Sequence, residues 1–166
     1  MTTAARSGFG RSLSLALAAI LPVVAASLAG QYVTFPNLTP WYANLVKPSF
    51  NPPNAVFGPV WTALYILMAF AAWRILRLPS FMRRRRTALA LFYVQLGLNA
   101  FWSFAFFGAH SPLLGLVVII PLLAMIVATI AAFRRLDAVA AWCLVPYLVW
   151  VSFATILNAS VWWLNA

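Results

Sequence analysis

Five long apolar stretches, separated by short segments that carry charges or prolines, constrain this chain most. They cover roughly residues 13–33, 55–76, 87–107, 112–133 and 139–164. A helix that crosses hydrocarbon needs about 20 apolar residues, so each stretch is long enough to span a membrane. Because the five stretches use most of the 166 residues, the sequence predicts an all-α membrane protein, a single domain over residues 1–166 built as a bundle of five transmembrane helices.

The composition excludes a water-soluble globule. Of the residues, 65% are hydrophobic and only 7% are charged, which leaves too little polar surface to cover a domain of this size. The first stretch has a second interpretation, because Arg6 and Arg11 followed by an apolar run and Ser27-Leu28-Ala29 also fit a secretory signal cleaved after Ala29. The length of the run favours a retained helix.

The positive charges predict the orientation in the membrane. The formal net charge is +10, and the arginines fall in the N-terminal tail, the second connection and the fourth connection, which a five-helix bundle places on one side. Lys47 is the single cation on the other side. The positive-inside rule then puts the N-terminus in the cytoplasm, and we expect the inner membrane of a bacterial cell. The grouping of the arginines on one side of a membrane bundle argues against a nucleic-acid partner. Two interpretations remain for the run Arg83 to Arg86: it determines the topology, or it binds anionic lipid headgroups.

The connection over residues 34–54 is the longest and is rich in proline. Five prolines fix φ along it, which predicts a largely extended segment; they are Pro36, Pro40, Pro48, Pro52 and Pro53. Two interpretations remain open. The segment is either a lid over an opening in the bundle or a plain interfacial loop anchored by Trp41 and Tyr42.

Three of the expected helices carry aromatic or polar residues on one face. Side chains three or four positions apart share a helix face, and the sets are Phe57, Trp61 and Tyr65; Gln95, Asn99 and Ser103, with Trp102 and Phe106 alongside; and Tyr147, Trp150, Ala154 and Asn158. Unpaired amides are costly in hydrocarbon, so we expect the second set to face the bundle interior. There they either form hydrogen bonds between helices or orient a polar group of a ligand.

These segments resemble a known family. The motifs are W-Y-x-x-L-x-K-P-x-F-x-P-P from Trp41, F-G-P-x-W-x-x-L-Y from Phe57, Q-L-x-x-N-x-x-W-S from Gln95 and P-Y-L-x-W from Pro146. Together they are similar to the translocator proteins or tryptophan-rich sensory proteins (TspO/MBR). The resemblance implies a five-helix bundle, a homodimer, and a cavity beneath the first loop that binds porphyrins, sterols and aromatic ligands. No basic residue follows Arg135, so the family's C-terminal sterol motif is absent, and Phe50 stands where many relatives have Trp.

The resemblance places Tyr42, Trp61, Asn99, Trp102, Trp150 and Ala154 in that cavity. Together with the neighbours on the same helix faces, the candidate ligand-binding residues are Tyr42, Phe57, Trp61, Tyr65, Gln95, Asn99, Trp102, Phe106, Tyr147, Trp150, Ala154 and Asn158. The expected ligand is a free-base porphyrin such as protoporphyrin IX. With His110 in a connection and Cys143 in a span, we expect no metal site and no required cofactor.

Three functions remain open. The first is a membrane sensor or receptor that binds porphyrins and assists their movement, and the second is an enzyme in which Trp61 and Trp150 support light- or oxygen-dependent porphyrin breakdown. The third is a structural membrane protein whose tryptophans only pack. Apart from Arg74 at the end of the second span, which belongs with the charges of the second connection, the spans hold no charged residue for a proton relay. The chain has no carboxylate pair or nucleophile–base set. Active pumping and hydrolysis are therefore disfavoured, and no other catalytic residue is expected.

Overall fold

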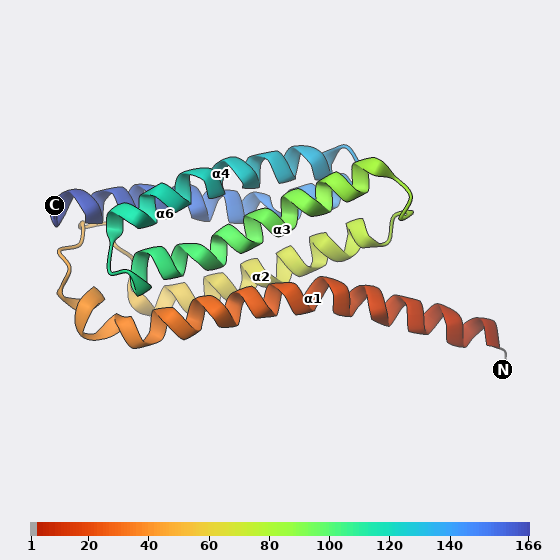
Figure 1. Cartoon of the computed structure of the whole chain (residues 1–166), viewed down its shortest axis with the longest axis horizontal. Coiled ribbons are helices and arrows are strands. Elements are labelled where there is room, and N and C mark those ends of the chain that lie inside the picture. The colour runs from red at the N-terminus through yellow and green to blue at the C-terminus, as the bar shows by residue number, and fades with distance from the viewer. Residues whose placement is uncertain (1–2) are drawn as a thin grey trace.

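The computed structural model describes residues 3–166 (Figure 1). The side chains of residues 3–9 and 11 lie outside the described part. The expectation that Arg6 and Arg11 lie on the cytoplasmic side therefore falls outside the described residues. All statements below concern the remainder of the chain.

Helices make up nearly the whole described structure. In chain order they are α1 (Thr3–Asn37), the wide turn η1 (Leu38–Tyr42), α2 (Asn54–Leu76), α3 (Arg83–Ser103), the wide turn η2 (Phe104–Gly108), α4 (Pro112–Arg134), α5 (Ala138–Cys143) and α6 (Val145–Leu164). Within residues 3–166, five helical segments are long and apolar enough to cross a membrane. This confirms the predicted all-α architecture of five spans, and the protein is a multi-pass integral membrane protein.

The first span runs further than the sequence predicted. Pro36 lies inside α1 and Pro40 inside η1, so the prediction that the connection is extended from residue 34 is wrong for its first half. Pro36 has no N–H to donate to the Tyr32 carbonyl, a defect that membrane helices tolerate. One residue along, the Asn37 side-chain amide donates to the Val33 carbonyl at 2.8 Å near the end of α1. The irregular part is residues 45–53, called the strap below.

The last span is broken rather than continuous. The sequence predicted one helix over residues 139–164, but α5 ends at Cys143 and α6 starts at Val145. Pro146 has no backbone N–H, so it cannot donate to the Trp142 carbonyl as an uninterrupted helix requires. The two helices together still form one candidate span, Ala138–Leu164.

Two clusters of buried residues form the core. α4 packs on α3 and α6, while α1 packs on α2 and α3. The larger cluster includes Phe92 and Phe133 and reaches Val151, and the smaller cluster, below the strap, consists of Tyr42, Phe106, Phe107, Leu157 and Val161. Residues of both clusters line the candidate site.

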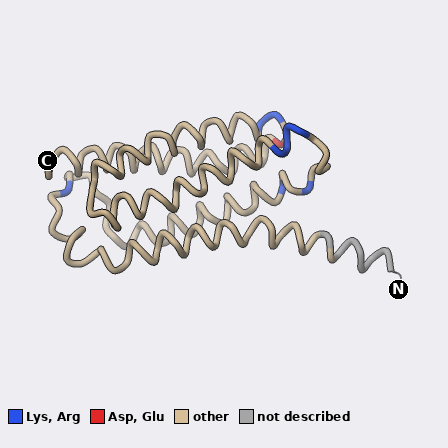
Figure 2. The backbone as a smooth tube through the Cα atoms, in the orientation of Figure 1, with Lys and Arg blue, Asp and Glu red and all other residues tan. Residues whose placement is uncertain are grey.

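Charged residues gather at one end of the bundle. Figure 2 shows the arginines of the α2–α3 and α4–α5 connections together at the end where α1 begins, and Lys47 at the opposite end. Some of these arginines are part of the packing. Arg85 donates to the Ile75 carbonyl at 3.2 Å and to the Leu76 carbonyl at 3.1 Å, so its guanidinium binds the last carbonyls of α2, in addition to the Leu78 amide, which donates to Ile75.

Asp137 joins the α4–α5 connection to the last turn of α2 at the arginine-rich end. Its carboxylate accepts from the Ala140 amide at 3.0 Å, as an N-cap of α5, and pairs with the Arg74 guanidinium at 2.8 Å. Burial raises the pKa of Asp137, but the Ala140 amide and Arg74 outweigh it, so the pKa lies below its ordinary value. The ionised carboxylate therefore stabilises the fold.

We expect Asp137→Ala to lower the free energy of unfolding by about 1 kcal/mol at pH 7, because a cap is lost. A carboxylate whose pKa is lower in the folded state stabilises the fold fully at pH values above its unfolded-state pKa, which is about 3.9 for Asp. That stabilisation is lost as the pH falls through the folded-state pKa. The difference between wild type and variant in thermal denaturation midpoint should thus narrow below about pH 4. Asp137→Ser retains a capping oxygen and should recover most of the loss; equal loss in both variants would assign the effect to Arg74.

Candidate functional site

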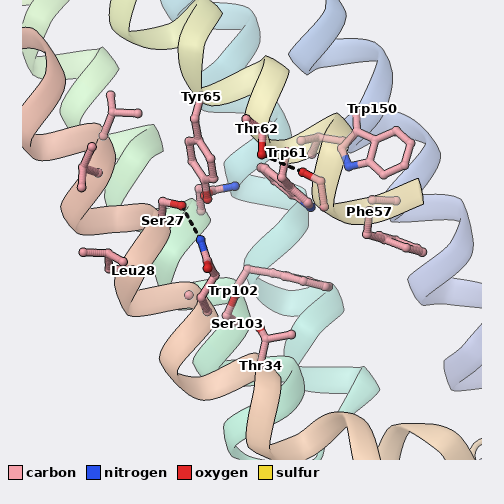
Figure 3. Close-up of a pocket in the computed structure, with 18 of the residues that line it drawn as sticks. Ser27, Leu28, Thr34, Phe57, Trp61, Thr62, Tyr65, Trp102, Ser103 and Trp150 are labelled. Carbon is pink, nitrogen blue, oxygen red and sulfur yellow. Dashed lines mark hydrogen bonds between the residues drawn. The ribbon is translucent and has the colours of Figure 1, made fainter. Parts of the chain in front are cut away.

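A cavity of about 1180 Å³ lies between α1, α2, α3 and α6. This volume is somewhat larger than the roughly 300–1,000 Å³ typical of small-molecule sites. Figure 3 shows Trp61 of α2, Trp102 of α3 and Trp150 of α6 projecting toward the same space. Among the described residues that line the cavity, none is charged.

Most of the predicted site residues meet in this cavity. Those that line it are Tyr42, Phe57, Trp61, Tyr65, Asn99, Trp102, Phe106, Trp150, Ala154 and Asn158. They come from five elements, η1, α2, α3, η2 and α6, and the structure brings them around one cavity. Their role in binding a ligand stays a prediction.

Gln95 and Tyr147 do not line the cavity. Each is only 1% exposed and lies within the packed core. Both amide atoms of Gln95 and the hydroxyl of Tyr147 lack a hydrogen-bond partner, while the Tyr147 ring contacts Trp61 edge-on with centroids 6.2 Å apart. Their role in binding a ligand stays a prediction, and the structure places both side chains in the core beside the cavity rather than in its lining. A shared helix face fixes the direction of a side chain but not the depth at which the space beside it is filled.

Hydrogen bonds fix the polar part of the cavity wall. The Tyr65 hydroxyl donates to Asn99 Oδ1 at 3.0 Å, between α2 and α3. Trp102 Nε1 donates to Asn158 Oδ1 at 3.1 Å, and Asn158 Nδ2 donates to the Pro112 carbonyl at 2.8 Å. Asn99 and Asn158 therefore hold helices together, and they present amide groups at the cavity surface at the same time.

Each of the three indoles contacts neighbouring aromatic rings. Trp61 packs against Tyr65 with centroids 5.3 Å apart, and Trp102 stacks on Phe106 at 5.1 Å. Phe57 meets Trp150 edge-on at 5.7 Å. Aromatic pairs at such distances are favourable beyond their buried area, so the three indoles are already oriented around the empty space between them.

The sequence analysis missed the contribution of the first span. Ser27, Gln31 and Thr34 line the cavity, and Gln31 Nε2 donates to Ser27 Oγ at 2.8 Å (Figure 3). Polar residues at i, i+4 and i+7 in an otherwise apolar helix are a signal that could have identified them.

Phe107 also lines the cavity and was not predicted. In η2 the amides of Ala109 and Ser111 donate to carbonyls five residues earlier, at 2.8 and 3.1 Å. This wider turn places Phe107 beside Phe106 below the strap. Such turns are rare and have no clear sequence signature.

The cavity is open toward one side of the bundle. It continues as a groove between α1 and α2, with the exposed side chains of Leu28, Phe35 and Ile66 along its margin. In a membrane these side chains face acyl chains rather than water. A lipophilic molecule in the bilayer therefore has a path to the aromatic walls that does not cross the aqueous phase.

Aromatic residues close the cavity below the strap. Trp41 of η1 contacts Phe106 and Phe107 edge-on and stacks on the His110 ring at 4.8 Å. His110 Nε2 lies 2.6 Å from Asn37 Oδ1, so this exposed histidine joins the α3–α4 connection to the end of α1. It does not line the cavity.

Comparison with known proteins decides the family. A profile of the TspO/MBR family matches residues 18–164. The chain belongs to the TspO/MBR family. It is 44% identical to the tryptophan-rich protein TspO of Chlorobaculum tepidum over 142 residues. The aligned region covers 86% of this chain and 90% of that protein.

Other TspO/MBR relatives come from distant organisms. The tryptophan-rich protein TspO of Archaeoglobus fulgidus is 42% identical over 153 residues, 90% of this chain and 96% of the relative. The human translocator protein is 39% identical over 123 residues, 74% of this chain and 73% of the relative. The family match thus extends over all five spans and confirms the resemblance seen in the motifs.

Proposed function

We propose that the protein binds flat, conjugated, lipophilic molecules of the porphyrin class in the cavity between α1, α2, α3 and α6. The observation that carries the proposal is the neutral cavity of about 1180 Å³ surrounded by Trp61, Trp102 and Trp150. Indole faces suit a planar conjugated ring, and the absence of charge in the lining suits an apolar one. The role that follows is sensory, regulatory or transport-assisting.

The energetics are adequate for such binding. A planar ligand that buries about 400 Å² of apolar surface gains on the order of 10 kcal/mol, at about 25 cal/mol per Å². Loss of translational and rotational freedom offsets a large part of this gain. Micromolar affinity remains, which suits a sensor that responds to changes in ligand concentration.

Titration with protoporphyrin IX tests the proposal, with tryptophan fluorescence as the readout in neutral phosphatidylcholine nanodiscs. We expect saturable quenching, and about tenfold weaker binding for Trp61→Ala or Trp150→Ala, because each substitution removes a stacked indole. Trp163→Ala is the matched control, since Trp163 is 77% exposed and lies outside the cavity lining. Unsaturable quenching in the wild type, or equal losses in all three variants, would contradict the proposal.

A second function is favoured by the same two indoles. Trp61 and Trp150 both line the cavity, as porphyrin breakdown by light and oxygen would require. Illumination of the complex in air distinguishes the two functions: loss of the porphyrin absorption band that depends on Trp61 and Trp150 indicates an enzyme, and a stable band indicates a binding protein.

We also propose that the protein lies in a bacterial inner membrane with its N-terminus in the cytoplasm, and that it forms a homodimer. The shared position of the arginines at one end of the bundle supports this orientation. The strap and Lys47 then face the outside.

A further inference from the structure

Lys47 is the one cation at the strap end of the described chain (Figure 2). The only acidic side chain, Asp137, is at the opposite end and pairs with Arg74 at 2.8 Å. Within the described residues no ion pair involves Lys47. Its charge is therefore left without a carboxylate partner from the protein.

The ammonium group lies beside the aromatic end of the cavity. Lys47 Nζ is 4.6 Å from the centre of the Tyr42 ring, and Tyr42 lines the cavity. The ammonium donates to the carbonyls of Ala43 at 3.2 Å and Leu45 at 3.0 Å. Because an ammonium has three donors, one N–H remains for a further acceptor.

The strap holds Lys47 in this position. The backbone of the preceding residue, Val46, forms two hydrogen bonds with the side-chain amide of Asn165, at 3.0 and 2.9 Å. Asn165 Nδ2 also donates to the Val161 carbonyl at 2.7 Å, which fixes the amide to the end of α6. Further along the strap, Asn51 Oδ1 accepts from the Tyr42 hydroxyl at 3.3 Å. The position of the ammonium is thus built by contacts with two spans.

We propose that Lys47 binds a carboxylate carried by an otherwise apolar, planar ligand, so that the acidic edge of the ligand lies at the strap and its rings lie among the indoles. This assignment rests on the proposed function and defines its ligand class as amphipathic acids. A carboxylate within the neutral cavity would be costly to desolvate, so the acidic edge must stay at an aqueous end. At the arginine-rich end, Arg74 and Arg77 contact Phe70 and Trp73, which line the cavity, but Arg74 is already paired with Asp137. At the strap end, Tyr42, which Lys47 contacts, meets Phe106, and Phe106 stacks on Trp102. Lys47 is therefore the cation beside the indole part of the cavity.

The test compares two ligands with the same ring system. Protoporphyrin IX has two carboxylates, and its dimethyl ester has none. We measure dissociation constants for both by tryptophan quenching in phosphatidylcholine nanodiscs, with wild type, Lys47→Gln and Lys47→Arg. Lys47→Gln should weaken binding of the acid about tenfold, as expected for a lost charge-assisted hydrogen bond at a half-exposed site, and change binding of the ester less than about twofold. Lys47→Arg should keep most of the affinity for the acid.

Asn165→Ala provides a second variant, because it keeps the charge of Lys47 but removes the hydrogen bonds between the Asn165 side chain and the Val46 backbone that position the strap. We expect it to reduce the preference for the acid over the ester in the same direction as Lys47→Gln, by a smaller factor. Raising the salt concentration should weaken binding of the acid to wild type and leave Lys47→Gln unchanged.

The outcomes separate this assignment from the proposed function. The carboxylate assignment is wrong if wild type binds acid and ester equally well, or if Lys47→Gln weakens binding of both ligands equally. Lys47 then only caps the end of the first span, and the proposal of porphyrin binding is unaffected. If wild type binds neither ligand saturably, the proposed function fails and this assignment fails with it.

Discussion

Gly115→Ala is expected to destabilise the bundle by about 3 kcal/mol, at the upper end of the cost of overpacking a core. A β-carbon at Gly115 would lie 2.6 Å from Asn158 Oδ1 and 2.8 Å from Phe106 Cδ2. Neither neighbour can retreat easily, since Asn158 holds Trp102 and the Pro112 carbonyl, and Phe106 stacks on Trp102. We therefore expect weaker porphyrin binding together with the lower thermal denaturation midpoint.

Gly97→Ala is the matched control for this substitution. Gly97 also lies inside a helix, but a β-carbon there meets no atom within 4 Å. Alanine favours helix over glycine by up to about 1 kcal/mol, so this variant should be as stable as wild type or more so, with unchanged ligand affinity. A similar loss in both variants, measured by circular dichroism on heating in detergent, would show that the close contact at Gly115 is not what limits stability.

Asn158→Leu should lower the free energy of unfolding by about 2 kcal/mol and also weaken porphyrin binding. The substitution leaves the Trp102 indole N–H without an acceptor, and an unpaired buried donor costs about 1–3 kcal/mol. It also removes the bond from Asn158 Nδ2 to the Pro112 carbonyl, which joins α6 to the start of α4. Trp102 can then change its orientation at the cavity wall.

Gln95→Leu gives the opposite expectation for a polar residue of the same bundle. Gln95 is buried, and neither of its amide atoms has a partner, so an apolar side chain of similar size avoids the desolvation cost. We expect Gln95→Leu to be neutral or stabilising and to leave porphyrin affinity unchanged, because Gln95 does not line the cavity. If Gln95→Leu destabilises as much as Asn158→Leu, Gln95 has a polar partner and belongs to the site after all.

Residues near the ends of helices were predictable from short-range chemistry. Serine followed by proline favours the start of a helix, and the Ser111 side chain accepts from the Leu114 amide at 3.2 Å at the start of α4. Asp137 is an N-cap of α5 and also pairs with Arg74, which lies at the end of α2. A cap involves residues within one turn, whereas an ion pair across connections depends on how the helices pack.

By itself, the sequence determined the five spans, the grouping of arginines on the same side of the bundle and the aromatic residues that supply the cavity walls. Each is a local property, since the length of an apolar run must match the membrane and side chains three or four residues apart share a face. The tertiary structure alone decided that α1 continues through Pro36, that Leu144 interrupts the last span, and that Gln95 and Tyr147 are buried away from the cavity. It also decided that Asn165 holds the backbone of Val46. These features arise from contacts between segments far apart in the chain. Helix periodicity does not indicate which helix faces meet, or at what depth in the bundle a cavity remains between them.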